Sequence, residues 1–408
     1  MKIRKIIKIS VLILIIIIVP YGVYFLYRLD KPKIIKPFPD PFIFNNGTYV
    51  ESKGDWLVRR EEIKDILLDI EYGRMPGRPD AIKAKIIDSK EKDGGSTEKI
   101  IKLTLIPDNN SANIEIDYTL WVYIPKGEGP FPTIVKVSPD GTGNQEEINQ
   151  KVVERGYMFV CYNHTELDPD TCGYDVDGPC QKAYSNYSWG SLAVWAWGAM
   201  RVVDFLLNEP WAEELDGIPD IDSKALIVTG HSRRGKTALL AGAIDERFTM
   251  VVPNNSGCGG AGSFLIQGYF CETIASITSK ARFKSWFEED FEEYAGREYR
   301  LGFDQHFLRA LVAPRLILST EAYWDVWSNP SGTQAIYEAC IPIFEFLGVK
   351  KNNAIHYRMW GGHAYTAEDF QVVMDFSDKM LLDKETSGEF YMTPFNIDFP
   401  ITYGIPNQ

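Results

Sequence analysis

Residues 225–236 read ALIVTGHSRRGK, and we interpret this stretch as the centre of the fold. Ala225 to Val228 are apolar, which is typical of a buried strand, and residues 237–244 favour a helix. A strand, a sharp turn with a serine at its apex and a helix form the geometry called a nucleophile elbow. The stretch therefore predicts that Ser232 is exposed at the end of a strand.

Such a turn has a chemical purpose. Serine is a weak nucleophile, so it must stand where a histidine can take its proton. The helix that follows directs its first N–H groups toward any oxyanion formed beside Ser232. The spacing departs from the common Gly-x-Ser-x-Gly, because Arg234 stands at the second glycine position and Gly235 comes one residue later. The alternative is a serine that only caps a helix.

Composition narrows the class of protein. The chain has 408 residues, of which 45% are hydrophobic, enough for one large core or two small ones. Its formal net charge of −13 argues against nucleic acid as a partner, because a polyanion would be repelled.

The N-terminal segment predicts membrane targeting. Four cationic residues between Lys2 and Lys8 precede an uncharged run of 19 residues, 9–27, which as a helix crosses most of a bilayer core. Positive charge before the run places the rest of the chain outside the cytoplasm. No Ala-x-Ala pattern follows, so we favour an uncleaved signal-anchor within residues 1–30; a cleaved signal peptide and secretion remain the alternative.

The remaining chain predicts three further parts. Residues 31–55 include a Pro- and Lys-rich stretch that favours an extended spacer, and residues 56–408 form the catalytic domain. A helix at 56–72 precedes antiparallel strands at 81–88, 99–107 and 114–125. From Phe131 strands alternate with helices, which predicts a three-layer αβα sandwich with a mostly parallel central sheet, the α/β-hydrolase fold.

The sequence also predicts the structure of several other segments. A helix at 189–207 places its tryptophans in the core, and a broken helix at 264–287 forms a cap or wall over the site. The loop Ser138 to Asn144 follows a strand, where an α/β-hydrolase supplies an oxyanion-hole N–H; an ordinary turn is the alternative. Cys172 and Cys180 are close enough in sequence for a disulfide if the chain faces outside, whereas the other four cysteines fit buried thiols.

A catalytic triad follows from chain order. Ser232, an acid after the strand at 316–318, and His363 after the last strand follow the Ser…acid…His order of α/β-hydrolases. All three lie at the carboxyl ends of strands, where such sheets bind ligands. His363 is the best placed of five histidines.

Several motifs together resemble the bacterial glucuronoyl esterases of carbohydrate esterase family 15. They are Gly230-x-Ser232-Arg233-x-Gly235-Lys236, the run 254–260 (NNSGCGG), 189–198 (WGSLAVWAWG), Ala313-Pro314-Arg315, Asp325-x-Trp327 and Gly361-Gly362-His363. The likeness extends from about Trp56 onward. It implies a serine hydrolase of α/β-hydrolase fold, without metal or other cofactor, that cleaves the ester between the 4-O-methylglucuronic acid of xylan and lignin alcohols.

The resemblance also implies roles for individual residues. Ser232 would be the nucleophile and His363 the general base, and Arg233 would flank the oxyanion. The residues implied to bind the sugar are Lys236, Glu272 and Trp327.

One position departs from the family pattern. Many members place the catalytic Glu just before Ser-Gly-x-Gly-Gly, where this chain has Asn255. An amide cannot stabilise an imidazolium as a carboxylate does. Other bacterial members carry the acid after the next strand, so we expect Asp325 to orient His363, with Glu321 as second choice.

Two other functions stay open at this point. The triad alone does not set the acyl group, so the chain could deacylate acetylxylan or another carbohydrate instead of a glucuronoxylan or lignin–carbohydrate ester. Asn255 also leaves room for a non-catalytic, surface-held glycan-binding protein. The oligomeric state does not follow from the sequence.

Overall fold

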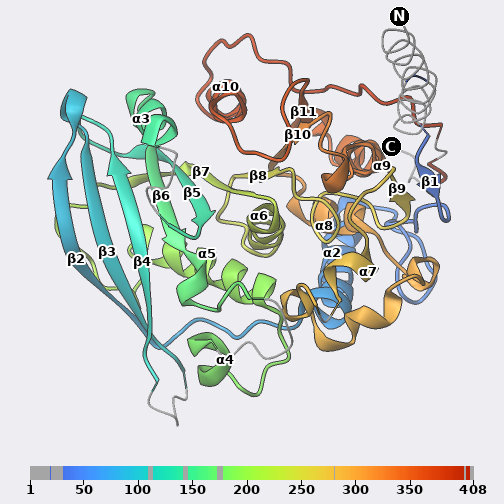
Figure 1. The fold of residues 1–408 in the computed structure, drawn as a ribbon, viewed down its shortest axis with the longest axis horizontal. Coiled ribbons are helices and arrows are strands. Elements are labelled where there is room, and N and C mark those ends of the chain that lie inside the picture. The colour runs from blue at the N-terminus through green and yellow to red at the C-terminus, as the bar shows by residue number, and fades with distance from the viewer. Residues whose placement is uncertain are drawn as a thin grey trace, which may run out of the picture.

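The fold is built on a nine-stranded sheet with the order β11-β10-β8-β7-β5-β6-β4-β3-β2 (Figure 1). It comes from a computed structural model that describes residue 19 and residues 31–108, 114–140, 146–171, 178–279, 281–398 and 401–404. Nearly all of the expected signal-anchor, residues 1–30, lies outside these ranges. Within them, no helix is long and apolar enough to cross a membrane.

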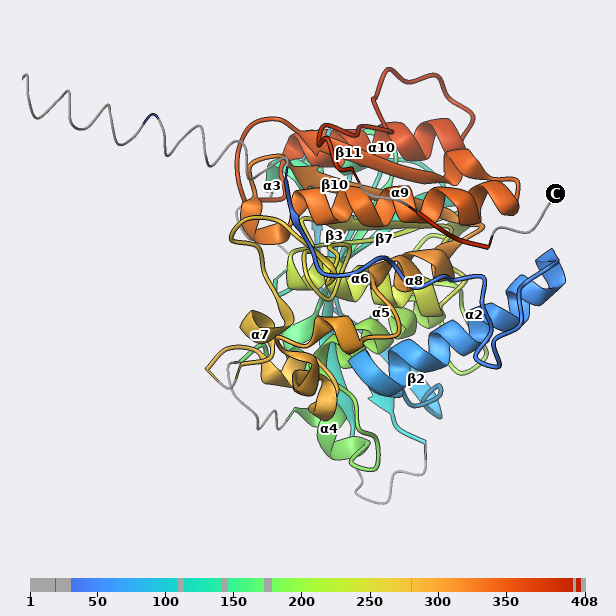
Figure 2. The ribbon, with the colours of Figure 1, turned by 90° about the vertical axis from the view of Figure 1, so that its right-hand side faces the viewer.

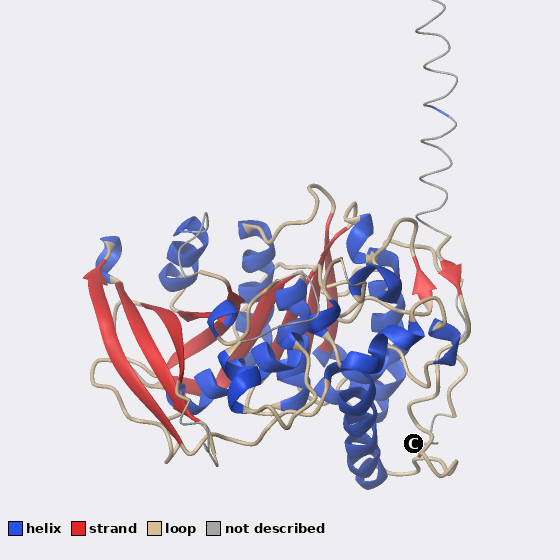
Figure 3. Cartoon of the chain, turned by 60° about the horizontal axis from the view of Figure 1, so that its bottom comes forward, coloured by secondary structure: helices blue, strands red, loops and turns tan. Residues whose placement is uncertain are grey.

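The edge of the sheet at β2 is antiparallel, as the sequence predicts. β2 (Ala81–Glu91), β3 (Thr97–Ile106) and β4 (Ile116–Ile124) form a meander, and β4 pairs antiparallel with β6 (Met158–Asn163). Figure 3 shows these long outer strands curving away from the rest of the sheet.

The remaining strands are parallel. They are β5 (Phe131–Ser138), β6, β7 (Ile221–His231), β8 (Met250–Asn254), β10 (Leu316–Ala322) and β11 (Asn353–Arg358). Their apolar runs are buried on both faces, which is why these sequences do not alternate. The mostly parallel central sheet is therefore confirmed.

Helices cover both faces of the sheet, which gives three layers (Figure 2). On one face α3 (Glu146–Glu154) and α10 (Ala367–Leu381) share a hydrophobic cluster with the strands. On the other, the larger cluster includes α2 (Lys53–Leu67), α5 (Ser191–Leu206), α6 (Arg233–Ile244) and α8 (Gln305–Val312). Trp195 and Trp197 on α5 are buried in this core, as predicted. The other α-helices among the described residues are α4 (Pro179–Ala183), α7 (Ile274–Ile277) and α9 (Pro330–Phe346).

Three expectations about the periphery need correction. The segment after residue 31 is extended but lies against the domain: β1 (Lys33–Ile34) pairs with β9 (Ile266–Gln267), and Phe42 is fully buried. Besides β9, the described residues of 264–287 form the single helical turn of α7 and one 3₁₀ turn, not a broken long helix. Cys180 is a buried free thiol, and Cys172 lies outside the described residues.

Candidate active site

The elbow at Ser232 has the predicted geometry. β7 ends at His231 and α6 begins at Arg233, and Ser232 between them has φ 58° and ψ −125°. Residues other than glycine rarely adopt this backbone conformation, so the backbone is strained at the apex of the turn. The Ser232 N–H donates to the Asn254 carbonyl at 2.9 Å, which holds the turn against β8.

The shifted glycine follows from packing inside this turn. A Cβ on Gly230 would lie 2.2 Å from the carbonyl oxygen of Arg234, and one on Gly235 would lie 2.9 Å from the carbonyl oxygen of Gly230. The two glycines therefore face each other across the elbow. Position 234 has no such restriction, and its guanidinium lies 3.9 Å from Asp170.

Three residues far apart in sequence meet at the carboxyl edge of the sheet. Nε2 of His363 lies 2.9 Å from Oγ of Ser232, and Nδ1 of His363 lies 2.6 Å from Oδ2 of Asp325. A carboxylate can only accept, so Nδ1 carries the proton and Nε2 presents its lone pair to the Ser232 hydroxyl. This is the arrangement that removes a proton from serine.

The environment keeps Asp325 ionised. Burial would raise the pKa of this carboxyl, but hydrogen bonds from His363 and Ser328 outweigh burial and hold the pKa below its ordinary value. The Ser328 hydroxyl lies 2.5 Å from Oδ2 of Asp325. Asp325 can therefore carry the negative charge that stabilises a protonated His363.

Glu321, the second-choice acid, does not contact His363. Its side chain is fully buried on β10, and among the described residues neither carboxyl oxygen has a hydrogen-bond partner. Burial, together with the charges of Asp325 and Asp369, raises the pKa of Glu321 well above its ordinary value. Burial therefore favours the neutral form of Glu321, behind the site.

Arg233 is fixed on the other side of Ser232. Its guanidinium lies 4.5 Å from the ring centroid of Phe283 and 4.6 Å from that of Trp286. Its Nη1 donates to Asp170 at 2.9 Å. Burial would raise the pKa of Asp170, but His164 and Arg233 lower it to about 2. Sequence reasoning missed Asp170, because it precedes Arg233 by 63 residues and no pattern links the two.

These side chains surround a cleft of about 370 Å³. Five of the residues singled out in the sequence line it: Ser232, Arg233, Glu272, Trp327 and His363. Arg282, Phe283 and Trp286, which the sequence analysis did not single out, complete the lining, so the 264–287 segment does form a wall. The Arg282 guanidinium lies 5.2 Å from the Trp327 ring.

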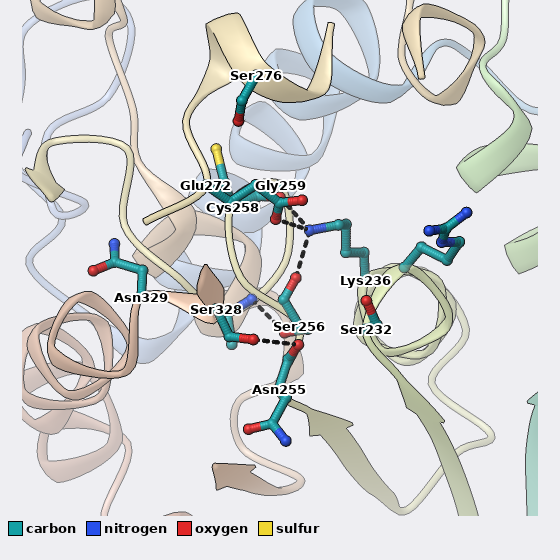
Figure 4. A network of polar contacts seen from close by, with 12 residues as sticks. Ser232, Lys236, Asn255, Ser256, Cys258, Gly259, Glu272, Ser276, Ser328 and Asn329 are labelled. Carbon is teal, nitrogen blue, oxygen red and sulfur yellow. Dashed lines mark hydrogen bonds and ion pairs between the residues drawn. The ribbon is translucent and has the colours of Figure 1, made fainter. Parts of the chain in front are cut away.

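Lys236 lies beneath the cleft and does not line it. Its Nζ donates to Glu272 at 2.6 Å and to the carbonyl oxygens of Ser256 and Cys258 at 2.5 and 2.6 Å (Figure 4). An ammonium has three protons, so these acceptors use all of them. Lys236 therefore orients the Glu272 carboxylate, and Glu272 is itself part of the cleft lining.

Two expectations remain, one about the groups that stabilise the oxyanion and one about metal binding. Residues 141–144 of the expected oxyanion loop lie outside the described ranges, whereas Ser138 ends β5 as predicted. The N-terminal turn of α6 begins with Arg233, so its free N–H groups lie beside Ser232. The described part of the chain contains no group of three or more His, Cys, Asp or Glu side chains that could hold a metal ion.

Comparisons with known proteins agree on one family. The family model described as "Glucuronyl esterase, fungi" matches residues 108–348. The chain is 28% identical to 4-O-methyl-glucuronoyl methylesterase 1 of Phanerochaete chrysosporium, over 87% of this chain and 72% of the relative. It is 27% identical to a carbohydrate esterase from an unknown prokaryotic organism, over 86% of this chain and 91% of that relative.

Solved structures show the same likeness. A glucuronoyl esterase of carbohydrate esterase family 15 from Caldicellulosiruptor kristjansonii superposes with a TM-score of 0.74 at 30% identity, covering 89% of this chain and 95% of that one. A promiscuous esterase of the same family from a marine bacterial metagenome superposes with a TM-score of 0.72 at 26% identity, covering 85% and 97%.

Proposed function

The chain belongs to the glucuronoyl esterase family and is a carboxylic ester hydrolase, and we propose that Ser232, His363 and Asp325 carry out its reaction. Its substrate is the ester of a 4-O-methylglucuronoyl group, the group in the names of the fungal relatives. The contact of Ser232 with His363 at 2.9 Å, inside the cleft, is the observation that carries the proposal.

The geometry supports an acyl-enzyme mechanism. Oγ of Ser232 attacks the ester carbonyl carbon while its proton passes to Nε2 of His363. The tetrahedral oxyanion forms beside the N-terminal turn of α6 and Arg233, where N–H groups and positive charge stabilise it. The C–O bond to the alcohol then breaks, and the alcohol takes the proton from His363. Water attacks the acyl-enzyme by the same route, which releases the uronate and restores Ser232.

Two other residues of the cleft lining, Glu272 and Trp327, fit a sugar ring. Glu272 presents a carboxylate that accepts hydrogen bonds from hydroxyl groups, and Lys236 holds it in place. Trp327 is 36% exposed, so its indole offers an apolar surface and an N–H to the same ring. Lys236 is thus a positioning residue and not a direct sugar ligand.

The location of the protein is part of the proposal. The uncharged run at 9–27 and the cations before it support an extracytoplasmic enzyme, anchored by residues 1–30 or secreted after cleavage. On this view residues 31–55 join the anchor to a catalytic domain at 56–408, although they also pack against that domain.

Hydrolysis of benzyl glucuronate by the purified chain tests the activity. We expect turnover that is lost in Ser232→Ala, because no other nucleophile replaces the missing Oγ. Acetylated xylan, assayed in parallel, separates a glucuronoyl esterase from a general deacylating esterase. Sugar binding without turnover of either ester, unchanged in Ser232→Ala, would contradict the enzymatic proposal.

A further inference from the structure

Two consecutive asparagines lie behind the triad: Asn254 ends β8, and Asn255 follows it. Asn254 is fully buried and Asn255 is 1% exposed, and the mechanism above uses neither. Oδ1 of Asn255 accepts the Ala322 N–H at 2.7 Å, and its Nδ2 donates to the Ala364 carbonyl at 3.2 Å. A backbone N–H can only donate and a carbonyl only accept, so both contacts fix the same orientation of the amide.

These contacts join the two segments that carry the base and its acid. Ala364 follows His363 directly, and Ala322 ends β10 three residues before Asp325. The main chain of Asn255 adds two contacts to the same region. Its N–H donates to the Thr320 carbonyl at 3.0 Å, and its carbonyl oxygen lies 3.1 Å from the Ser328 hydroxyl, whose single proton it shares with Asp325 (Figure 4). Asn255 is thus bonded to both sides of the His363–Asp325 pair.

Asn254 fixes the neighbouring histidine in a similar way. Its Nδ2 donates to the carbonyl and the hydroxyl of Thr320 at 3.1 and 3.0 Å, which leaves Oδ1 to accept from Nδ1 of His231 at 2.6 Å. Burial lowers the pKa of His231 to about 4, so its ring is neutral at neutral pH. This ring lies 4.5 Å from the ring of His363, between centroids, and limits its movement.

We propose that Asn255, supported by Asn254, is the positioning residue that holds His363 and Asp325 in register with Ser232. The amide ties the His363 loop to the end of β10, so that Nε2 of His363 stays 2.9 Å from the nucleophile. The inference rests on the proposed function only in taking Ser232 and His363 as nucleophile and base. It does not depend on which acyl group the enzyme accepts.

Two substitutions isolate the amide. Asn255 has φ +42°, a backbone conformation that would be strained in alanine. We therefore use Asn255→Gly, which removes the side chain without adding backbone strain. Asn255→Asp keeps an acceptor for the Ala322 N–H but loses the donor to the Ala364 carbonyl. The second variant therefore breaks the tie to the His363 loop and also adds a buried carboxylate, for which a control is needed.

The matched control is Asn353→Asp. Asn353 is also 1% exposed, accepts from Nε of Arg309 at 2.7 Å and donates to the Tyr337 carbonyl at 3.0 Å. It begins β11, at the amino end of the strand, whereas His363 follows its carboxyl end. The control thus also replaces the amide of a buried, doubly bonded asparagine by a carboxylate, here beside Arg309 and at the end of the strand away from the triad.

The test measures how fast an alkyl fluorophosphonate inactivates each full-length variant. In this reaction Ser232 attacks phosphorus, fluoride leaves and His363 takes the proton, so the rate reports the Ser232–His363 geometry without sugar recognition. We expect both Asn255 variants to react about 10- to 100-fold more slowly than the wild type, since a displacement of about 1 Å costs about that much. On benzyl glucuronate, kcat falls by a similar factor and KM stays within about twofold.

Several outcomes would overturn the inference. Folded Asn255→Gly and Asn255→Asp proteins that are inactivated at the wild-type rate would show that the amide does not position the base. An equal slowing in Asn353→Asp would show a general effect of a buried charge. If Asn255→Gly does not fold, Asn255→Asp alone decides. A wild-type chain that reacts with the fluorophosphonate but not with benzyl glucuronate would refute the proposed substrate and leave this inference intact.

Discussion

Asp325 and Glu321 are four residues apart, yet their environments shift the pKa values of the two carboxyls in opposite directions. Asp325 receives hydrogen bonds from His363 and Ser328, which favour the charged form. Glu321 points into the interior without a partner among the described residues, and burial favours its neutral form. Of the two carboxyls, Asp325 is the one that contacts His363 and so can offset a positive charge on its ring.

The two isosteric amide variants test this assignment. We expect Asp325→Asn to lower kcat on benzyl glucuronate by about 10²- to 10⁴-fold, because the amide stabilises neither the imidazolium nor the required tautomer. Glu321→Gln keeps the shape of a neutral acid, so kcat is expected to stay within about twofold of the wild type. Comparable losses in both variants would show that the acid is shared or wrongly assigned.

At the scale of elements, the elbow joins β7 to α6 through a turn with almost no free space. Gly230 and Gly235 meet inside it, and Ser232 keeps its strained backbone because β8 holds the turn from the side. The strain is offset by the parallel sheet around it, whose strands are buried on both faces.

Gly230→Ala is expected to destabilise the fold by about 3 kcal/mol, because its Cβ would lie 2.2 Å from a backbone carbonyl oxygen that cannot move without opening the turn. The control is Gly302→Ala, where no atom lies within 4 Å of the new Cβ and φ is not positive. That change is expected to alter stability by less than about 1 kcal/mol. Urea unfolding measures both, and equal effects would refute the packing argument.

At the scale of the whole molecule, buried carboxyl groups away from the triad couple stability to pH. Burial raises the pKa of Glu71 to about 8 and that of Asp168 to about 7. The folded chain therefore keeps protons that the unfolded chain has released above pH 4.5. Because the native state binds more protons in this window, the free energy of unfolding falls as pH rises through 8. Burial lowers the pKa of His306, so this residue makes the free energy of unfolding rise with pH, but only below pH 6.5.

We therefore expect the urea midpoint of the wild type to fall between about pH 6.5 and 8.5. In the wild type the Gln305 side-chain amide donates to Oε1 of Glu71 at 2.7 Å. Glu71→Gln keeps an oxygen that accepts this hydrogen bond but has no carboxyl proton to lose. Its midpoint is expected to change less over the same range. Parallel curves for the two proteins would show that Glu71 does not titrate in this window.

The local sequence was sufficient for much of the fold. The elbow at Ser232, the antiparallel meander and the alternating strands and helices were predictable, because each depends on apolar periodicity and turn residues within about ten positions. His363 could also be identified, since a loop after the last parallel strand must reach the carboxyl edge of the sheet. The broken helix expected at 264–287 was wrong, because the apolar side chains of this segment pack as an irregular wall and not along one helix face.

Contacts between distant segments were decided only by the tertiary structure. The sequence offered two acids for His363, and the structure brings only Asp325 to it, across 38 residues. It likewise turns Lys236 toward Glu272, pairs Arg233 with Asp170 and bonds Asn255 to two other loops. Periodicity determines which face of a strand or helix is buried. Loop side chains instead find partners that depend on which strand ends are neighbours and on which buried polar groups need a hydrogen bond, and both are set by the packing of the whole sheet.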